Sequence, residues 1–334
     1  MTSWGTTTTI RADKVPAYHC LLRPPSSMSE HRIAFVVPTK DRREDLRQML
    51  ASLARQTRRP DQVIVVDGSD PPVRDVLDAV RELPVDYVRE FPPSLARQRN
   101  AGMACVRPDI TLAGYLDDDI VLEPEAVERM LDFWERAGAE VGGAAFTITN
   151  NPPPGALRLK QAFGIDHERP GRVLRSGFAS TITAQPHDIE TQWLYGGATV
   201  WRRAVIDAFP YDEWFVGTGF MEDIDFSYTV GARYRLFVVA AARLAHYSRP
   251  VRTDRQRLLG KWQVVNRMHV VRKHRARGLS VAAAWCASFG LFLLNFAAAV
   301  VRRRRDPFNR ALGNAAGMAD ELFGRREQIG GHLK

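Results

Sequence analysis

Cysteine is scarce in this chain of 334 residues, which contains only Cys20, Cys105 and Cys286. These cysteines are widely spaced and odd in number, so the sequence indicates neither a disulfide framework nor a zinc site. We therefore expect a protein of a reducing, cytosolic compartment. Residues 1–30 lack the apolar core and cleavage site of a secretory signal, and their Pro, Ser and Thr content predicts a mobile N-terminal arm.

Two glycine-rich signatures of nucleotide binding are also missing. No Gly-x-Gly-x-x-Gly follows the first expected strand, and no Gly-x-x-x-x-Gly-Lys-Ser/Thr occurs in the chain. These absences count against dinucleotide-dependent dehydrogenases and P-loop ATPases. No recognition-helix or RNA-binding signature accompanies the net charge of +9, so we expect no nucleic-acid partner.

Apolar runs that alternate with helical patterns dominate the first half of the chain. We expect a buried strand over 33–37, further strands over 63–66, 85–88 and 111–116, and one of the intervening helices over 73–83. Such alternation predicts right-handed βαβ units, and hence a Rossmann-like α/β fold with a mostly parallel sheet and flanking helices.

Polar clusters follow three of these strands, at Pro38–Arg42, Asp67–Asp70 and Asp117–Asp119. Because ligands of parallel sheets bind beyond the carboxyl ends of the strands, we expect the three clusters to share one crevice. Adjacent carboxylates repel one another, so a run such as Asp117–Asp119 indicates a nearby positive charge. Mg²⁺ or Mn²⁺ bridging to phosphate is the leading candidate, and an acidic turn before a helix is the alternative.

Six short motifs follow one another between residues 32 and 275. They are Val36-Val-Pro-Thr-Lys-Asp-Arg42, Val65-Val-Asp-Gly-Ser69, Arg99-Asn-Ala-Gly102, Leu116-Asp-Asp-Asp119, Gly196-Gly197 and Met221-Glu-Asp-Ile-Asp-Phe226. Their order and spacing resemble the family 2 glycosyltransferases, which are inverting enzymes of GT-A fold. One departure is Gly68, which follows Asp67 where the family often has a second acidic residue, so the resemblance does not imply a uracil contact there.

The resemblance implies two sets of donor-side residues. The nucleotide-sugar set is Pro38, Thr39, Asp41, Arg42, Asp67, Arg99, Asn100, Asp117 and Asp118. The set of Mg²⁺ or Mn²⁺ ligands is Asp119, Asp117 and His246. Asp119 is the first choice as ligand, while Asp117 is also placed toward the donor ribose or sugar.

The resemblance also implies catalytic carboxylates at Glu222, Asp223 and Asp225. Inverting transfer is a direct displacement at the anomeric carbon, so the acceptor hydroxyl must lose its proton to a positioned base. Asp223 matches the base position of the family, and Asp225 is the second choice. The alternative is that these carboxylates only stabilise the first turn of a helix through its dipole.

The acceptor side is expected around Gly196, Gly197 and Trp214. A strand is expected over 193–200, in which the glycine pair lets the backbone approach a ligand or marks a bulge. A further strand is expected over 236–240.

The end of the chain carries an apolar run over 279–301, between Arg272–Arg277 and Arg302–Arg305. A spanning helix would carry the second arginine group across the membrane, against the positive-inside tendency. A helix lying on the membrane would keep both groups near anionic lipid. Both arrangements and a buried helix stay open, with an amphipathic helix following over 312–323.

We divide the chain into an arm over 1–30, a glycosyltransferase domain over 31–275 and a membrane-associated helical tail over 276–334. The domain comprises a nucleotide-sugar half over 31–120 and an acceptor and catalytic half over 121–275.

The expected function is metal-dependent, inverting transfer of a single sugar from a nucleotide-diphosphate sugar. The acceptor is a saccharide or a lipid-linked molecule of the cell envelope, reached from the cytoplasmic face of the cell membrane. The alternatives are a sugar-nucleotide pyrophosphorylase, whose Gly-rich Arg-Leu start is missing after the first strand, and a non-catalytic nucleotide-sugar-binding protein.

Overall fold

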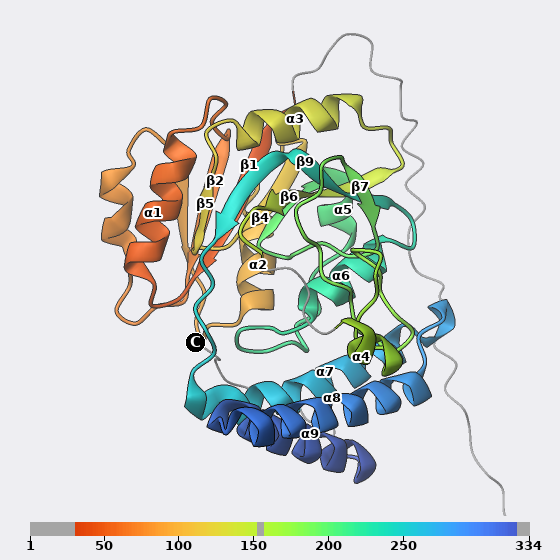
Figure 1. Ribbon diagram of the computed structural model, residues 1–334. Helices are drawn as coiled ribbons and strands as arrows, with labels where there is room; N and C mark the ends of the chain where they lie inside the picture. Colours follow the sequence, from red (N-terminus) through yellow and green to blue (C-terminus); the bar gives the residue numbers. More distant parts are fainter. Residues whose placement is uncertain (1–30, 152–156, 326–334) are drawn as a thin grey trace, which may run out of the picture. The chain divides into compact units, whose positions relative to one another are not determined.

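The computed structural model describes residues 31–151 and 157–325, so the predicted arm lies outside the described residues (Figure 1). The described residues belong to one compact unit. The strands are β1 (Ile33–Thr39), β2 (Gln62–Asp67), β3 (Val85–Arg89), β4 (Leu112–Leu116), β5 (Ile120–Leu122), β6 (Val141–Ile148), β7 (Ile189–Thr191), β8 (Ala198–Arg202) and β9 (Arg235–His246). The α-helices are α1 (Arg43–Ala54), α2 (Leu95–Ala104), α3 (Ala126–Arg136), α4 (Leu157–Ala162), α5 (Arg203–Ala208), α6 (Glu222–Val230), α7 (Gln256–Lys273), α8 (Val281–Arg302) and α9 (Arg305–Leu322). The 3₁₀ helices are η1 (Arg74–Ala79), η2 (Thr253–Arg255) and η3 (Arg275–Arg277).

The strands form one mixed sheet in the order β3–β2–β1–β4–β8–β6–β9–β5, with β7 paired to β9 beside that path. Strands β1 to β4 are mutually parallel, and β6 pairs in parallel with β9. Strands β5, β7 and β8 pair antiparallel to their neighbours. The predicted α/β fold with a mostly parallel sheet is therefore confirmed.

Alternating side chains of β1 supply the two faces of the sheet. Ile33, Phe35 and Val37 join a core that includes residues of α1 and α3. Ala34 and Val36 join the opposite core, which includes residues of α2, α6 and α7. Since both faces are covered, the strand reads as a continuous apolar run rather than as an alternating one.

Three predicted elements differ from the observed ones. The helix expected over 73–83 is only the short 3₁₀ helix η1, because the carboxylate of Asp67 binds the N–H of Val73 and shapes the start of this connection. The strand expected over 193–200 pairs only from Ala198 onward, because the preceding residues turn around the candidate site. The strand expected over 236–240 is longer than predicted, since β9 runs from Arg235 to His246.

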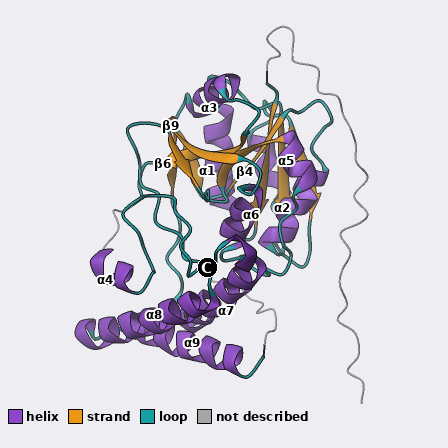
Figure 2. Cartoon of the chain, turned by 90° about the vertical axis from the view of Figure 1, so that its right-hand side faces the viewer, coloured by secondary structure: helices purple, strands orange, loops and turns teal. Residues whose placement is uncertain are grey.

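Helices α7, α8 and α9 lie side by side beneath the sheet in both views (Figures 1 and 2). Helices α7 and α9 approach so closely that a Cβ atom on Gly260 would lie 2.1 Å from Arg310 O, and one on Gly313 would lie 2.1 Å from Arg257 O. Buried Asn314 donates to Gly260 O over 2.8 Å and accepts from Asn295 of α8 over 2.8 Å. Glycine contacts and a buried amide thus tie the three helices together.

Candidate active site

The aspartate cluster lies where β4 ends and β5 begins. Asp117 donates its backbone N–H to Gly197 O over 2.9 Å. Ile120, the first residue of β5, is paired with His246, the last residue of β9. This antiparallel register brings the imidazole of His246 beside Asp119.

Three side chains here have the composition of a metal site. Nε2 of His246 lies 2.9 Å from Oδ1 of Asp119. Ligand atoms of Asp117, Asp119 and His246 all lie within 4.8 Å of one another. Hard divalent cations such as Mg²⁺ and Mn²⁺ take carboxylate oxygens, and Mn²⁺ also accepts imidazole. The donor set therefore fits a divalent cation.

Asp118, the middle residue of the cluster, bonds to the end of β1 instead. Thr39 Oγ1 donates to Oδ2 of Asp118 over 2.8 Å. Nη1 of Arg42 donates to Oδ1 of Asp118 and to Oδ2 of Asp119, over 2.8 Å each. Burial raises the pKa of Asp118 to about 7, although Arg42 opposes this shift. The side chain of Asp118 thus joins two of the strand-end clusters that were expected to share one crevice.

Arg99 of α2 connects this cluster to α6. Its side chain is only 1% exposed, and it donates to Oε1 of Glu222 over 2.9 Å and to Oδ1 of Asp117 over 3.3 Å. The guanidinium also lies over the ring of Tyr211, at 5.0 Å from the centroid. Burial favours the neutral form, but Tyr211, Glu222 and Asp117 together raise the pKa of Arg99 above its usual value. Arg99 is therefore a fixed cation between the two acidic groups.

Glu222 and Asp223 begin α6, immediately after Met221. Oε2 of Glu222 accepts the N–H of Phe220 over 2.9 Å. The half-buried carboxylate of Asp223 accepts from Ile224 N over 2.8 Å and from Gly196 N over 3.4 Å. Burial and the charge of Asp223 raise the pKa of Glu222 to about 7, and burial also raises the pKa of Asp223.

Asp225 has different surroundings, although it lies only two residues further along. Its side chain is buried, and its oxygens accept from Lys273 Nζ over 2.7 Å and contact His274 Nε2 at 2.9 Å. Both partners belong to the end of α7 and the turn after it. The structure therefore places Asp225 in an ion-pair network with α7, apart from the group formed by Asp223, Glu222 and Arg99.

Residues 34–198 match the family model described as glycosyl transferase family 2. Residues 34–198 therefore form a family 2 glycosyltransferase domain. The chain has no match among curated protein sequences.

Solved glycosyltransferase structures share the fold. A mannosyltransferase from Pyrobaculum calidifontis in complex with GDP-Man and Mn²⁺ is 15% identical, covers 91% of this chain and 92% of its own, and has a TM-score of 0.53. GalNAc-T7 with UDP, GalNAc and Mn²⁺ is 16% identical, covers 66% of this chain and 43% of its own, and has a TM-score of 0.52. TarS of S. aureus, 14% identical at a TM-score of 0.46, covers 85% of this chain and 55% of its own. This chain thus spans about half the length of TarS and GalNAc-T7, and the two likenesses above 0.5 show a GT-A fold.

The glycine pair of this glycosyltransferase domain, Gly196 and Gly197, leaves room for neighbouring acidic and basic side chains. A Cβ atom on Gly197 would lie 1.9 Å from Cγ of Asp117, and one on Gly196 would lie 2.7 Å from Nη1 of Arg99. Any side chain at these two positions would therefore displace Asp117 or Arg99. The close approach involves the enzyme's own side chains, which the sequence pattern did not predict.

Asp67 shapes the loop after β2. Its fully buried carboxylate accepts from Ser69 N over 2.7 Å, Val73 N over 2.9 Å and Arg89 Nη1 over 3.1 Å. The hydroxyl of Tyr87 donates to the same carboxylate. With this many donors around it, Asp67 holds the loop in place.

The loop after β1 packs against the loop after β2. Pro38 is buried in β1 opposite Val66. Asp41 adopts a φ of 56°, a left-handed conformation in which Asp is one of the better tolerated residues. Its N–H donates to Ser69 Oγ over 2.8 Å. The two loops predicted to bind the donor therefore form one surface at the strand ends.

Asn100 and Trp214 hold the segment that precedes α6. Nδ2 of Asn100 donates to Tyr211 O over 3.0 Å, and its Oδ1 accepts from Tyr211 N over 2.9 Å. Trp214 stacks on His269 of α7, with ring centroids 4.0 Å apart. These contacts anchor both residues to neighbouring elements.

Tyr195 is a site residue that sequence reasoning missed. It directly precedes the glycine pair and is half-buried. Burial, together with the charges of Asp223 and Asp166, raises the pKa of Tyr195 to about 12. The aromatic residue directly before Gly196 was the available signal, since Gly196 donates its N–H to Asp223.

Proposed function

We propose that this glycosyltransferase moves one sugar from a nucleotide-diphosphate sugar to an acceptor hydroxyl, with a divalent cation and with inversion at the anomeric carbon. One observation carries the proposal: Arg99 bonds both Asp117, a member of the candidate metal group, and Glu222, the neighbour of Asp223. The candidate metal group, which would serve the leaving diphosphate, therefore lies next to the candidate base.

The donor side would use Asp117, Asp119 and His246 to hold Mg²⁺ or Mn²⁺. A bound divalent cation would neutralise the charge that develops on the leaving nucleotide diphosphate. Two glycosyltransferases of the same fold bind Mn²⁺ together with a nucleotide or nucleotide sugar, which supports this assignment. Arg42 adds positive charge beside Asp119, and buried Arg99 keeps the carboxylate of Asp117 oriented.

Asp223 is the proposed general base. The acceptor hydroxyl attacks the anomeric carbon while its proton passes to the carboxylate of Asp223, and the bond to the nucleotide diphosphate breaks. The N–H groups of Gly196 and Ile224 orient this carboxylate, and burial raises its pKa. A carboxylate with a raised pKa is a stronger base than an exposed one.

The acceptor is proposed to be a lipid-linked or envelope saccharide at the cytoplasmic face of the membrane. Helix α8 is long and apolar enough to cross a bilayer, and 28% of its most apolar window is buried. Since one side of α8 packs against α7 and α9 while Phe289 and Phe296 are 54% and 45% exposed, we place the helix on the membrane surface.

The test is nucleotide release and sugar transfer from a panel of nucleotide sugars, with Mn²⁺ or with EDTA. We expect Mn²⁺-dependent release from one donor.

Asp223→Asn should lower kcat about 10³-fold while donor affinity changes less than about twofold, since a general base contributes roughly 10²–10⁴ in rate. Asp207→Asn, at an exposed ion pair on α5, is the matched control and should keep full activity. Release unaffected by EDTA, or an active Asp223→Asn enzyme, would disprove the corresponding role.

A further inference from the structure

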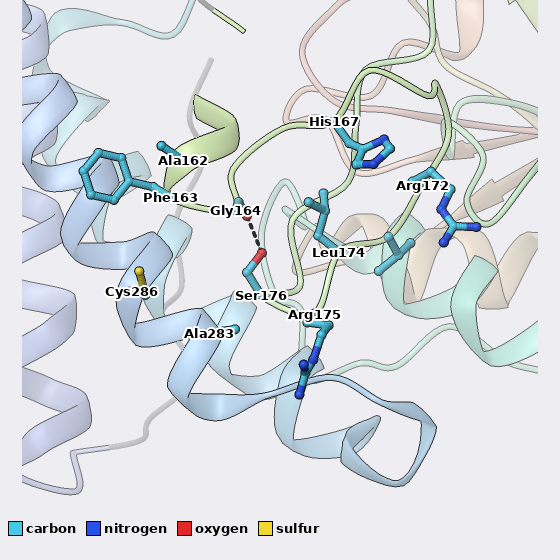
Figure 3. A pocket seen from close by; sticks show the side chains of 11 residues that line it. Ala162, Phe163, Gly164, His167, Arg172, Leu174, Arg175, Ser176, Ala283 and Cys286 are labelled. Carbon is cyan, nitrogen blue, oxygen red and sulfur yellow. Dashed lines mark hydrogen bonds between the residues drawn. The ribbon is translucent and has the colours of Figure 1, made fainter. Parts of the chain in front are cut away.

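A groove of about 430 Å³ runs between α8 and the segment from Ala162 to Ser176 (Figure 3). The two walls of the groove contact each other at both of its ends. Ser280 N donates to Arg175 O over 2.7 Å, and the Phe163 ring packs on Gly290, where a Cβ atom would lie 2.2 Å from Cγ of the ring. Ala283 and Cys286 of α8 lie between these contacts and line the groove.

The lining is mainly apolar, with cationic groups at the rim. Phe163, Val173 and Leu174 contribute apolar surface. Arg172 and Arg175 are exposed, and neither has a carboxylate partner among the described residues. An apolar trough beside unneutralised guanidinium groups is complementary to a molecule with an apolar chain and an anionic head.

A buried cation lies behind the same wall. Arg267 of α7 is 1% exposed and has no carboxylate partner among the residues that the structure describes. It stacks over the Phe178 ring at 3.5 Å, and Nη1 lies 3.4 Å from Ser288 Oγ on α8. The Nε atom has no partner within the described chain, and burial lowers the pKa of the guanidinium to about 9. A Cβ atom on Gly177, two residues after Arg175, would lie 3.0 Å from Cγ of Arg267, so this cation adds positive charge close to the segment that lines the groove.

The groove opens onto the exposed stripe of α8. Cys286 is exposed and stands at helical spacing from Phe289, Leu293, Phe296 and Val300, all of them exposed. The stripe therefore runs from the proposed membrane surface directly to the groove.

The other side of the groove leads toward the candidate base. Arg172 N donates to Ser180 Oγ over 2.8 Å, and Ser180 O accepts from Trp193 Nε1 over 3.1 Å. The ring of Trp193 lies 4.6 Å from that of Tyr195, and the next residue, Gly196, donates its N–H to Asp223. A chain of contacts thus links the groove wall to the candidate base. A chain lying in the groove would leave its head group on the acceptor side of the enzyme.

We propose that this groove binds the apolar chain of a lipid-linked acceptor, with the phosphate of the lipid at Arg172 and Arg175. The assignment rests on the proposed transfer to an acceptor hydroxyl and identifies the acceptor class as a saccharide that is linked to a lipid through phosphate. The chain enters along the exposed stripe of α8, and the head group is held by guanidinium groups while the sugar-accepting end lies toward Tyr195 and Asp223.

Cys286 provides a reporter within the groove, and Cys105 is an exposed cysteine elsewhere that serves as an internal control. The experiment measures the alkylation rate of each cysteine by N-ethylmaleimide in the full chain, using peptide mass spectrometry. The probes are dodecyl phosphate, dodecyl maltoside and inorganic phosphate, with both amphiphiles below their micellar concentrations.

We expect saturating dodecyl phosphate to slow alkylation of Cys286 about tenfold and to leave Cys105 within about twofold. Dodecyl maltoside should need a concentration about tenfold higher, because it lacks the charge, and inorganic phosphate should protect neither cysteine. Arg175→Gln should raise the half-protecting concentration of dodecyl phosphate about tenfold, which is the loss of one charge-assisted contact. Arg81→Gln, at an exposed arginine of another element, is the matched control.

Equal slowing of both cysteines would overturn the proposal, as would protection by inorganic phosphate alone or equal potency of the two amphiphiles. An Arg175→Gln variant with unchanged protection would equally overturn the head-group assignment. Release of nucleotide from the donor needs neither lipid nor groove, so its outcome distinguishes failure of this proposal from failure of the proposed function.

Discussion

Neighbouring carboxylates on α6 have different partners, and this difference predicts opposite effects on activity and stability. Asp225→Asn removes the charge that meets Lys273 and His274. We expect a loss of about 1–3 kcal/mol in the free energy of unfolding, because buried polar groups lose part of their bonding. The kcat of the folded enzyme should stay within about threefold.

Urea denaturation and kcat measured on the same preparations test this contrast. Asp223→Asn should show the reverse pattern, with near-normal stability and a large loss of kcat. An inactive but stable Asp225→Asn enzyme would mean that Asp225 takes part in the reaction.

The pH dependence of activity follows from the raised pKa of Asp223 and its neighbour. A general base acts only when deprotonated, so activity should rise with pH through its pKa. Burial raises the pKa of Asp223, and the pKa of Glu222 is raised to about 7. The acid limb of kcat/KM should therefore lie well above the ordinary aspartate value of about 3.9 and report the pair together. Profiles at saturating Mn²⁺ test this, and a limb near pH 4 would contradict it.

At the scale of single residues, motif order was more informative than the local pattern. The family resemblance predicted Asp117, Asp119 and His246 as ligands of one metal ion. The pairing of β5 with β9 brings the ligand atoms of these residues within 4.8 Å of one another. The partners of Asp225 could not be predicted from the sequence, because Lys273 and His274 are distant from Asp225 along the chain. Long-range contacts of this kind depend on how α7 packs.

At the scale of elements, the contact between α7 and α9 predicts a strict requirement for glycine. A methyl group on Gly313 would lie 2.1 Å from Arg257 O, so Gly313→Ala must push the helices apart. Overpacking of this kind costs about 1–3 kcal/mol.

Urea denaturation measures this cost. Gly231→Ala, at the exposed end of α6 with a φ of −62°, is the control and should change stability by less than about 1 kcal/mol. Equal stability of Gly313→Ala and the unmodified protein would show that the helices can separate without loss.

Elements with a buried apolar run were predictable, and those fixed by side-chain contacts were not. Strands β1, β2 and β4 follow their predicted ranges closely, because each is an apolar run that is buried on both faces. Strand β3, which is exposed or half-buried along its length, also matches its predicted range. The segment over 73–83 carries an amphipathic pattern too, yet its start is set by Asp67. Helix α9 begins at Arg305, earlier than the amphipathic pattern over 312–323 indicated. Tertiary contacts decided these boundaries.

At the scale of the whole molecule, the exposed stripe of α8 predicts binding to anionic membranes. Flotation with vesicles of phosphatidylcholine containing about a third phosphatidylglycerol should recover the full chain, and recovery should fall as salt rises, because Arg302–Arg305 contribute by charge.

Replacing both Phe289 and Phe296 by serine should weaken recovery of the protein with the vesicles at least about tenfold, because two aromatic rings that would insert into the membrane are lost. Phe91→Ser is the control, because Phe91 is 62% exposed at a distant loop. Unchanged flotation of the double variant would place the membrane contact elsewhere.

The boundaries expected at 31–275 and 276–334 stay a prediction, and the packing of α7 gives them a particular meaning. Helix α7 holds Asp225 of α6 through Lys273, and along the same length it holds α9 through Gly260. Cutting the chain before α8 would therefore expose the face of α7 that packs against α8 and α9, and it would also remove the proposed membrane-binding helix. Because α7 supports α6 as well, we expect that α8 and α9 cannot be exchanged as an independent module without loosening the helix that carries the candidate base.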